Sequence, residues 1–330
     1  MLDAGEKTTM NPAPLVSVCT PVYNGGKFLD QCIQGVLNQT FTDFEYIIVD
    51  NASTDDTRDI IEHYRTEDPR IRVFRNEKTI PVMENFNKCI RHISPDTGWI
   101  KYALADDILF PYCIQEMLRI GEQDSQIGIV SAYRLYGNKL HYLGLPMNQN
   151  IFDGAYILKK QILYEFRVCT GSPNSLMYRR EAFDALGGFS NEYIHTDTDL
   201  AFRMLNKYKL GFVHDVLTWT GLHEDRVEVE SIKSGRNIQE YIEFGYKKLK
   251  EYKSICLSEQ ELMQLADYYA GRILDFRISR LAKLDLGLPD TMSESIPAEI
   301  SSRYGTVFRK KWRRCTRSIL VAIKHSIFRK

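Results

Sequence analysis

The sequence predicts an α/β fold in which helices flank a mostly parallel sheet, followed by a helical C-terminal region. Between residues 15 and 110, short apolar segments of strand type alternate four times with segments of helical apolar spacing. That alternation is typical of a parallel sheet with helices on both faces. From residue 229 onward, long segments keep helical apolar spacing and contain few turn residues.

The elements of the first half can be placed in chain order from their boundaries. The first strand begins near Leu15 and ends at Asn24-Gly25-Gly26, a sequence typical of a turn. The second helix begins at Ser53-Thr54-Asp55-Asp56, which is rich in capping residues. The other predicted elements are a helix over 28–39, strands over 44–50, 71–77 and 99–107, and helices over 56–67 and 82–93.

We divide the chain into a flexible N-terminus (1–14), an α/β domain (15–228) and a helical C-terminal region (229–330). The second half of the α/β domain adds short apolar segments between Gly-containing turns. One further helix is predicted near 197–208, and a strand-like segment follows it.

The composition excludes several classes of protein. Lys+Arg and Asp+Glu both number 43, so the formal net charge is +0 and no nucleic-acid partner is expected. No apolar run approaches the roughly 20 residues that cross a bilayer, and residues 1–14 lack the apolar core of a signal peptide. The seven cysteines are scattered and form no Cys-x-x-Cys pair. We therefore expect a soluble, reduced, cytoplasmic protein.

Basic residues gather at the C-terminal end. Residues 303–330 contain ten Lys or Arg and no acid, and their apolar residues share one face of a predicted helix. Such a helix, with Trp312 at its interface, can lie on an anionic membrane surface, here the inner face of the membrane. It can equally pack on the body of the protein or on another subunit, and the sequence leaves both interpretations open.

Polar residues follow three of the predicted strands, at their carboxyl ends. They are Pro21-Val22-Tyr23-Asn24 after the first strand, Asp50-Asn51-Ala52-Ser53 after the second, and Asp106-Asp107 after the fourth. Parallel strands bring their carboxyl ends to one edge of a sheet, where such folds bind ligands. We therefore expect these three loops to form one site.

Carboxylates supply the chemistry expected at that edge. The adjacent Asp106 and Asp107 repel each other unless a cation neutralises them, and Mg²⁺ or Mn²⁺ takes oxygen ligands and bridges to phosphates. The pair therefore suggests a metal–diphosphate site, although a solvated turn or a helix cap has the same sequence. Asp50 can accept hydrogen bonds from a nucleotide's base or ribose. Its alternative is helix capping, for which Ser53 and Asp55 are better placed.

Two later positions can join the same site. Asp197 lies at the start of a predicted helix, where a carboxylate can act as a general base or cap the helix. In the same helix, Asp199 can pair with Arg203. His223 can complete a metal shell, although a lone histidine is more often structural. The first turn lacks Gly-x-Gly-x-x-Gly, and the chain has neither the Gly-x-x-x-x-Gly-Lys-Ser/Thr loop nor the Gly-x-Ser-x-Gly elbow.

Several segments of the chain together carry a resemblance to a known family. They are VSVCTPVYNGGKFLDQCIQGVLNQTFTDFEYIIVDNASTDDT, NEKTIPVMENFNKCI, ALADDILFP, GGFSNEYIHTDTDLAFRM and the segment around His223. The chain in these segments resembles the family 2 glycosyltransferases with the A-type (GT-A) fold, over roughly residues 15–225. The resemblance implies that residues 15–110 bind a nucleotide-diphospho-sugar and that residues 111–228 hold the acceptor and the catalytic group.

The resemblance also implies a role for each matching residue. Asp106 would hold the divalent metal, Mn²⁺ or Mg²⁺, on the donor diphosphate, with support from Asp107 and His223. Asp197 would deprotonate the acceptor hydroxyl as it displaces the diphosphate with inversion. The residues expected to line the donor site are Pro21, Tyr23, Asn24, Asp50, Asn51, Ser53, Asn85, Asn87, Asp106 and Asp107. Those expected to contact the acceptor are Ser172, Pro173 and Asn174.

Two positions depart from the family's pattern. Asn51 stands where many members have a second Asp after the second strand, and Leu104 replaces the first acid of the family's Asp-x-Asp motif. The expected acceptor is a glycan or lipid-linked glycan of surface polysaccharide biosynthesis. The alternatives are a non-catalytic sugar-nucleotide-binding protein and a nucleotidyltransferase. The presence of both Asp106 and Asp197 argues against the first alternative.

Overall fold

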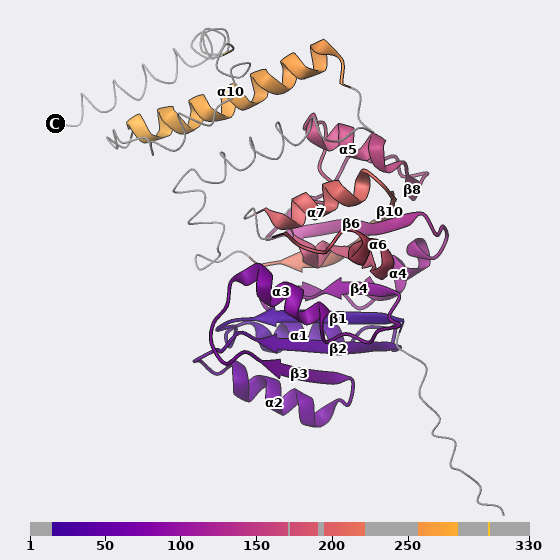
Figure 1. Ribbon diagram of the computed structural model, residues 1–330, viewed down its shortest axis with the longest axis vertical. Helices are drawn as coiled ribbons and strands as arrows, with labels where there is room; N and C mark the ends of the chain where they lie inside the picture. The colour runs from indigo at the N-terminus through magenta and orange to yellow at the C-terminus, as the bar shows by residue number, and fades with distance from the viewer. Residues whose placement is uncertain (1–14, 171, 191–194, 222–256, 283–302, 304–330) are drawn as a thin grey trace, which may run out of the picture. The chain divides into compact units, whose positions relative to one another are not determined.

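The computed structural model of the protein describes residues 15–170, 172–190, 195–221, 257–282 and 303 (Figure 1). The chain divides into two compact units, Met1–Gln161 with Phe166–His223 and Ile162–Glu165 with Glu224–Lys330. The predictions for the N-terminus (1–14), for His223 and for the basic tail beyond Arg303 lie outside the described residues.

Within the described residues, the strands of the first unit form one ten-stranded sheet. They are β1 (Val16–Val22), β2 (Phe44–Asp50), β3 (Ile71–Arg75), β4 (Trp99–Tyr102), β5 (Asp107–Leu109), β6 (Ile127–Tyr136), β7 (Lys139–His141), β8 (Ile151–Phe152), β9 (Leu176–Arg179) and β10 (Lys209–Thr220). The helices are α1 (Leu29–Leu37), α2 (Thr57–Glu67), α3 (Val82–Ile90), α4 (Cys113–Gly121), α5 (Gly154–Ile162), the 3₁₀ turn η1 (Pro173–Ser175), α6 (Arg180–Ala185) and α7 (Thr196–Leu205).

The strand order places the predicted site at one edge of the sheet. The main path runs β3-β2-β1-β4-β9-β6-β10-β5, and β1 pairs in parallel with both β2 and β4. β9 is antiparallel to both β4 and β6, so β6 runs in the same direction as β4. β10 pairs in parallel with β6 and therefore shares this direction. The carboxyl ends of β1, β2, β3, β4, β6 and β10 therefore meet at one edge, which the sequence predicts for the first, second and fourth of them.

Side-chain alternation gives the sheet two buried faces. On one face α1 buries Leu29, Cys32 and Val36 against strand residues such as Val18 and Tyr46. On the other face rings pack edge to face or stacked, with centroids 5.3–6.5 Å apart. These rings belong to Phe86, Tyr102, Tyr178, Phe183 and Phe189. Strands buried on both faces lack polar alternation, which is why they read as continuous apolar runs.

One predicted element is wrong in its extent. The sequence predicts a single strand over 99–107, but β4 ends at Tyr102 and Asp107 begins a separate strand, β5. The chain reverses between them because the Asp107 N–H donates to the Leu104 carbonyl at 2.9 Å. β5 then pairs antiparallel with β10, with Asp107 opposite Thr220. The acid pair therefore lies on a turn between two strands.

The second unit contains α10 (Glu259–Ala282), inside a segment predicted to be helical. Its start is a capping box, in which the Ser258 N–H donates to Glu261 at 2.8 Å and the Glu261 N–H donates to the Ser258 hydroxyl at 3.3 Å. Arg303 pairs with Asp267 at 2.5 Å. None of the helices in the described part of the chain is long and apolar enough to cross a membrane.

Gly121, at the end of α4, gives a test of the packing on the α1/α4 face. A Cβ at this position would lie 2.6 Å from two ring atoms of the fully buried Trp99. Because the ring cannot move away, Gly121→Ala should lower the free energy of unfolding by about 1–3 kcal/mol in urea denaturation. Gly98→Ala is the control, since its Cβ would meet the more mobile end of Leu15 at 3.2 Å. Equal losses in both variants would contradict this account of the packing.

Candidate active site

Hydrogen bonds join the loops that follow β1 and β2. The Asn24 N–H donates to the Ser53 hydroxyl at 2.9 Å, and the Thr54 N–H donates to the Asn24 side-chain carbonyl at 2.9 Å. Asn24 has a positive φ of 48°, a conformation that asparagine tolerates better than most residues. Tyr23, in the same loop, is 52% exposed, and Pro21 is half-buried. The first loop therefore presents an open aromatic ring beside the second loop.

Asp50 is buried at the end of β2 and organises the second loop. One of its carboxylate oxygens accepts the Ser53 N–H at 2.9 Å, and the other pairs with Arg75 at 3.2 Å. Arg75 also donates to the Ser53 carbonyl at 3.0 Å. The N-cap residue of α2 is Asp56, which makes no side-chain capping bond, and the Asp55 carboxylate accepts the N–H of Thr57, the first helical residue, at 3.1 Å. Of the two better capping candidates, Asp55 therefore bonds the start of the helix from outside the cap position, and Ser53 bonds the first loop.

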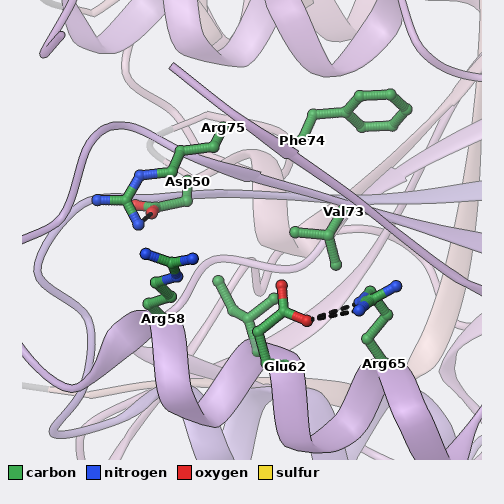
Figure 2. Close-up of a pocket in the computed structure, with 8 residues that line it drawn as sticks. Asp50, Arg58, Glu62, Arg65, Val73, Phe74 and Arg75 are labelled. Atoms are coloured by element: carbon green, nitrogen blue, oxygen red, sulfur yellow. Dashed lines mark hydrogen bonds and ion pairs between the residues drawn. The ribbon is translucent and has the colours of Figure 1, made fainter. Parts of the chain in front are cut away.

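A cavity of about 340 Å³ opens beside Asp50, between α2 and β3 (Figure 2). In Figure 2, Arg58 and Arg75 lie close to Asp50, whereas Arg65 pairs with Glu62 at 2.7 Å. Among the described residues, Arg58 has no ion-pair partner. The cavity is lined by Asp50, Arg58, Ile61, Glu62, Arg65, Val73, Phe74 and Arg75. Apolar side chains such as Val73 lie in this cavity beside arginine donors and the Asp50 carboxylate. Such a lining suits a planar base that carries carbonyl and N–H groups.

Three buried asparagines use their side chains within the protein. The Asn51 amide bonds the backbone of Ile80 on both sides, donating to its carbonyl at 2.9 Å and accepting its N–H at 3.0 Å. Asn76 donates to Asn51 at 2.7 Å and to Asn85 at 2.9 Å. Asn85 donates to the Val49 carbonyl at 3.2 Å. These contacts hold the 76–85 segment next to the end of β2 and so shape the predicted donor site.

Asn87 acts as a clamp between α3 and a distant loop. Its amide donates to the Phe189 carbonyl at 2.9 Å and accepts the Phe189 N–H at 3.3 Å. From the other side, Arg203 pairs with Asp199 at 2.8 Å and donates at 2.7 Å to two carbonyls of the 186–188 turn. The predicted pairing of Asp199 with Arg203 is confirmed. This turn is therefore fixed by both α3 and α7.

The acid pair lies beside the end of β10. Asp107 is buried and Asp106 is partly exposed. Gly221 follows β10, and a Cβ there would lie 3.0 Å from the Asp106 carbonyl. The described residues contain no group of three or more potential metal ligands. Two adjacent carboxylates nevertheless fit Mg²⁺ or Mn²⁺, which commonly take one or two protein carboxylates and complete the shell with phosphate and water.

The η1 turn carries the predicted acceptor residues, and all three are buried. Among the described residues, neither the amide nitrogen nor the amide oxygen of Asn174 has a hydrogen-bond partner, and the Ser172 hydroxyl has none either. Burying an amide in this way costs about 1–3 kcal/mol. A bound water or a ligand hydroxyl would satisfy polar atoms held in this way. The carbonyl of Asn174 accepts a hydrogen bond from the buried ammonium of Lys101.

Asp197 is the second residue of α7 and is partly buried. Its carboxylate accepts the Thr198 N–H at 2.7 Å. Two buried tyrosines lie within its electrostatic reach: burial raises the pKa of Tyr142 to about 12 and the pKa of Tyr178 well above its usual value, and Asp197 adds to both shifts. Both tyrosines therefore stay neutral at neutral pH.

Sequence reasoning missed three residues at this edge. Arg75 lies within the strand predicted over 71–77, where an arginine looks like an exposed strand residue. Lys101 interrupts an otherwise apolar strand, and a charged residue in such a run is the pattern that could have pointed to it. Arg58 shares its helix with other exposed charges and carries no distinguishing pattern.

Comparison with known proteins identifies the class of enzyme. Residues 17–187, just over half of the chain, match the pattern of Glycosyl transferase family 2. The chain belongs to this family and is a glycosyltransferase. An uncharacterized protein of Mycobacterium tuberculosis (strain CDC 1551 / Oshkosh) is 30% identical over 225 residues, which are 64% of this chain and 68% of that protein.

Named relatives include enzymes of polysaccharide synthesis. Chondroitin synthase of Escherichia coli is 29% identical over 166 residues, 50% of this chain and 24% of that enzyme. The putative teichuronic acid biosynthesis glycosyltransferase TuaG of Bacillus subtilis is 35% identical over 108 residues, 30% of this chain and 43% of that protein. This chain therefore matches less than half the length of these two relatives.

Solved structures confirm the predicted fold. Mannosyltransferase PcManGT from Pyrobaculum calidifontis has a TM-score of 0.58 and 16% identity, with 96% of this chain and 88% of that chain covered. Residues 1–349 of S. aureus TarS have a TM-score of 0.56 and 18% identity, with 91% of this chain and 91% of that fragment covered. The mostly parallel sheet flanked by helices is thus the GT-A fold.

The buried pair of α7 should matter far more than a matched exposed pair. Asp199→Ala leaves the partly buried Arg203, 21% exposed, without its carboxylate and should lower the free energy of unfolding by about 3 kcal/mol, the low end for a buried pair. Arg180 and Asp184 form the same i, i+4 pair at 2.6 Å, but the Asp184 side chain is 49% exposed against 1% for Asp199. Asp184→Ala should therefore cost no more than about 1 kcal/mol in the same denaturation experiment. Similar losses for the two variants would show that burial is not the cause.

Proposed function

We propose that this glycosyltransferase moves a sugar from a nucleotide-diphospho-sugar to a hydroxyl of a glycan or lipid-linked acceptor, with inversion and with a divalent metal. One observation carries the proposal: three groups lie at the carboxyl edge of one sheet. Asp50 ends β2 and lines the cavity, the Asp106-Asp107 turn follows β4, and Thr196 at the start of α7 contacts Met83 at the start of α3 at 3.3 Å. Base, diphosphate and acceptor groups of one reaction can therefore be bound side by side.

The donor's base would occupy the cavity beside Asp50. The Asp50 carboxylate can accept an N–H from the base edge, and Arg58 and Arg75 can donate to its carbonyl oxygens. Tyr23 is exposed enough to stack on the base or ribose. Structural relatives support a nucleotide-sugar donor, since S. aureus TarS has been solved with UDP-GlcNAc and the P. calidifontis mannosyltransferase with GDP-Man.

Asp106 and Asp107 would hold Mn²⁺ or Mg²⁺ together with the donor diphosphate. A bound divalent cation would stabilise the negative charge that develops on the diphosphate as it leaves. The mannosyltransferase structure, which contains Mn²⁺, supports this assignment. The family's pattern adds His223 as a further ligand. Asp107 is buried next to β10 and would fix the turn, while the more exposed Asp106 would face the donor.

Asp197 would act as the general base. Its carboxylate takes the proton of the acceptor hydroxyl as that oxygen forms a bond to the anomeric carbon, and the bond from that carbon to the diphosphate breaks. Attack from the opposite side of the sugar inverts the configuration. The clamp on the 186–188 turn and the Asp199–Arg203 pair would keep the start of α7 in place during this step.

A donor panel tests the chemistry directly. The full chain should release nucleoside diphosphate from one of the UDP-, GDP- or dTDP-sugars with Mn²⁺ and methyl glycosides as acceptors, and EDTA should stop the release. Asp106→Asn should lower turnover by about 100-fold or more. Asp197→Asn should lower kcat by about 10²–10⁴-fold while the Kd of the nucleoside diphosphate stays within about threefold.

Asp184→Asn, an exposed change, is the matched control for both variants and should turn over like the wild type. Turnover in EDTA would overturn the metal assignment, and an active Asp197→Asn variant would overturn the base. Binding of a sugar nucleotide without any turnover across the panel would favour a binding protein.

We also propose that the basic tail brings the enzyme to an anionic membrane, where a lipid-linked acceptor would be found. Arg303 is paired with Asp267, so a truncation should begin at residue 304 to leave that contact intact. Removal of 304–330 should abolish cosedimentation with phosphatidylglycerol vesicles, and 0.5 M salt should weaken wild-type binding because it screens the charges. Phosphatidylcholine vesicles are the control. Unchanged cosedimentation after truncation would refute the assignment.

A further inference from the structure

Lys101 is a fully buried lysine of β4 that the proposed reaction does not use. Its ammonium donates hydrogen bonds to the backbone carbonyls of Asn174 and Leu176, the second at 3.2 Å. These two carbonyls lie on either side of Ser175, one in the middle of η1 and one at the start of β9. A buried ammonium is costly unless it is well bonded, so these contacts account for a charged side chain in the interior.

The second neighbour of Lys101 is the acid pair. Burial lowers the pKa of the Lys101 ammonium, whereas the nearby Cys113 and the carboxylate of Asp107 act in the opposite direction. Lys101 thus lies within electrostatic reach of Asp107 and in direct contact with η1. It connects the turn assigned to the metal and diphosphate with the turn assigned to the sugar or acceptor.

Asn174 gives this contact a functional consequence. Its backbone carbonyl is held by Lys101, and its side-chain amide is fully buried with no hydrogen-bond partner among the described residues. An amide carries both donors and an acceptor, the set that a sugar hydroxyl can satisfy. The Asn174 side chain is attached to the Cα atom, which is bonded directly to the carbonyl that Lys101 holds. The direction of the side-chain amide therefore depends on where Lys101 fixes that carbonyl.

The geometry points to Lys101 as a positioning residue for sugar transfer, which fixes the η1 backbone so that the Asn174 amide can bind the hydroxyl groups of a sugar. The inference rests on the proposed function, and it goes beyond it by naming a residue that touches no substrate. The hydroxyl groups belong either to the transferred sugar or to the acceptor, and kinetics can separate these two sources.

The first measurement does not depend on activity. Lys101→Met keeps the length of the side chain but removes its charge and donors, and Lys101→Gln keeps one amide donor. Hydrogen exchange of the backbone amides of Ser172 and of 174–177 should become faster in Lys101→Met, less so in Lys101→Gln, and stay unchanged elsewhere in the sheet. Lys209→Met is the matched control, since Lys209 pairs with Asp124 at the opposite end of the strands.

The second measurement uses the sugar nucleotide selected by the panel. Lys101→Met should lower kcat by about 10- to 100-fold, because small misplacements cost this much, while the Kd of the free nucleoside diphosphate stays within about twofold. Asn174→Ala should have a similar effect, and the double variant should be no worse than Asn174→Ala alone within about threefold. A loss in donor hydrolysis assigns the amide to the transferred sugar, and a loss confined to transfer onto methyl glycosides assigns it to the acceptor.

Three results would overturn the inference. The first is unchanged hydrogen exchange and unchanged kinetics in Lys101→Met, and the second is a loss of kcat in the double variant equal to the product of the two single losses. The third is failure of both Lys101 variants to fold, which would make the lysine a folding determinant. If exchange protection is lost only at η1 in Lys101→Met but the wild type turns over no donor, the proposed function is refuted. The contact by which Lys101 fixes η1 is then still supported.

Discussion

The common direction of β1, β2 and β4 is the constraint on which the rest of the site depends. Parallel neighbours bring their carboxyl ends to one edge, but the loops that leave those ends have no strand ladder to join them. Side chains replace the ladder. Asn24 and Ser53 join the first two loops, and Asp50 with Arg75 closes the second loop on itself. The polar residues of this edge therefore hold the loops together, in addition to any role in binding a substrate.

The difference between local patterns and long-range contacts explains what the sequence could and could not predict. The strands, the helices and the shared edge followed from apolar periodicity, because strands buried on both faces and amphipathic helices leave a local pattern. The turn between β4 and β5 left no such pattern, because the apolar run continues through Ala103, Leu104 and Ala105 to the hydrogen bond between the Asp107 N–H and the Leu104 carbonyl. Long-range pairing with β10 decides that boundary, and a local window does not contain it.

The same limit applies to individual site residues. Asp50 and Asp197 stand out because carboxylates follow apolar segments, yet the sequence gives no sign that Arg75 pairs with Asp50 from a neighbouring strand. Asn51 and Asn85 match the family's donor region, but their amides bond Ile80 and the Val49 carbonyl. A motif therefore locates the region of a site more reliably than it tells which atoms remain open to a ligand.

Charge balance at the acid pair shows how the departure at Leu104 fits the rest of the structure. Leu104 contributes no carboxylate, so Asp106 and Asp107 are the acids of this turn, and the buried Lys101 lies within electrostatic reach of Asp107. A third acid would increase the repulsion within the turn, whereas two acids with one nearby ammonium leave a smaller negative charge. Such a turn needs a cation most when the donor diphosphate adds its own negative charge. The proposed metal would therefore bind more tightly together with the nucleotide sugar than alone.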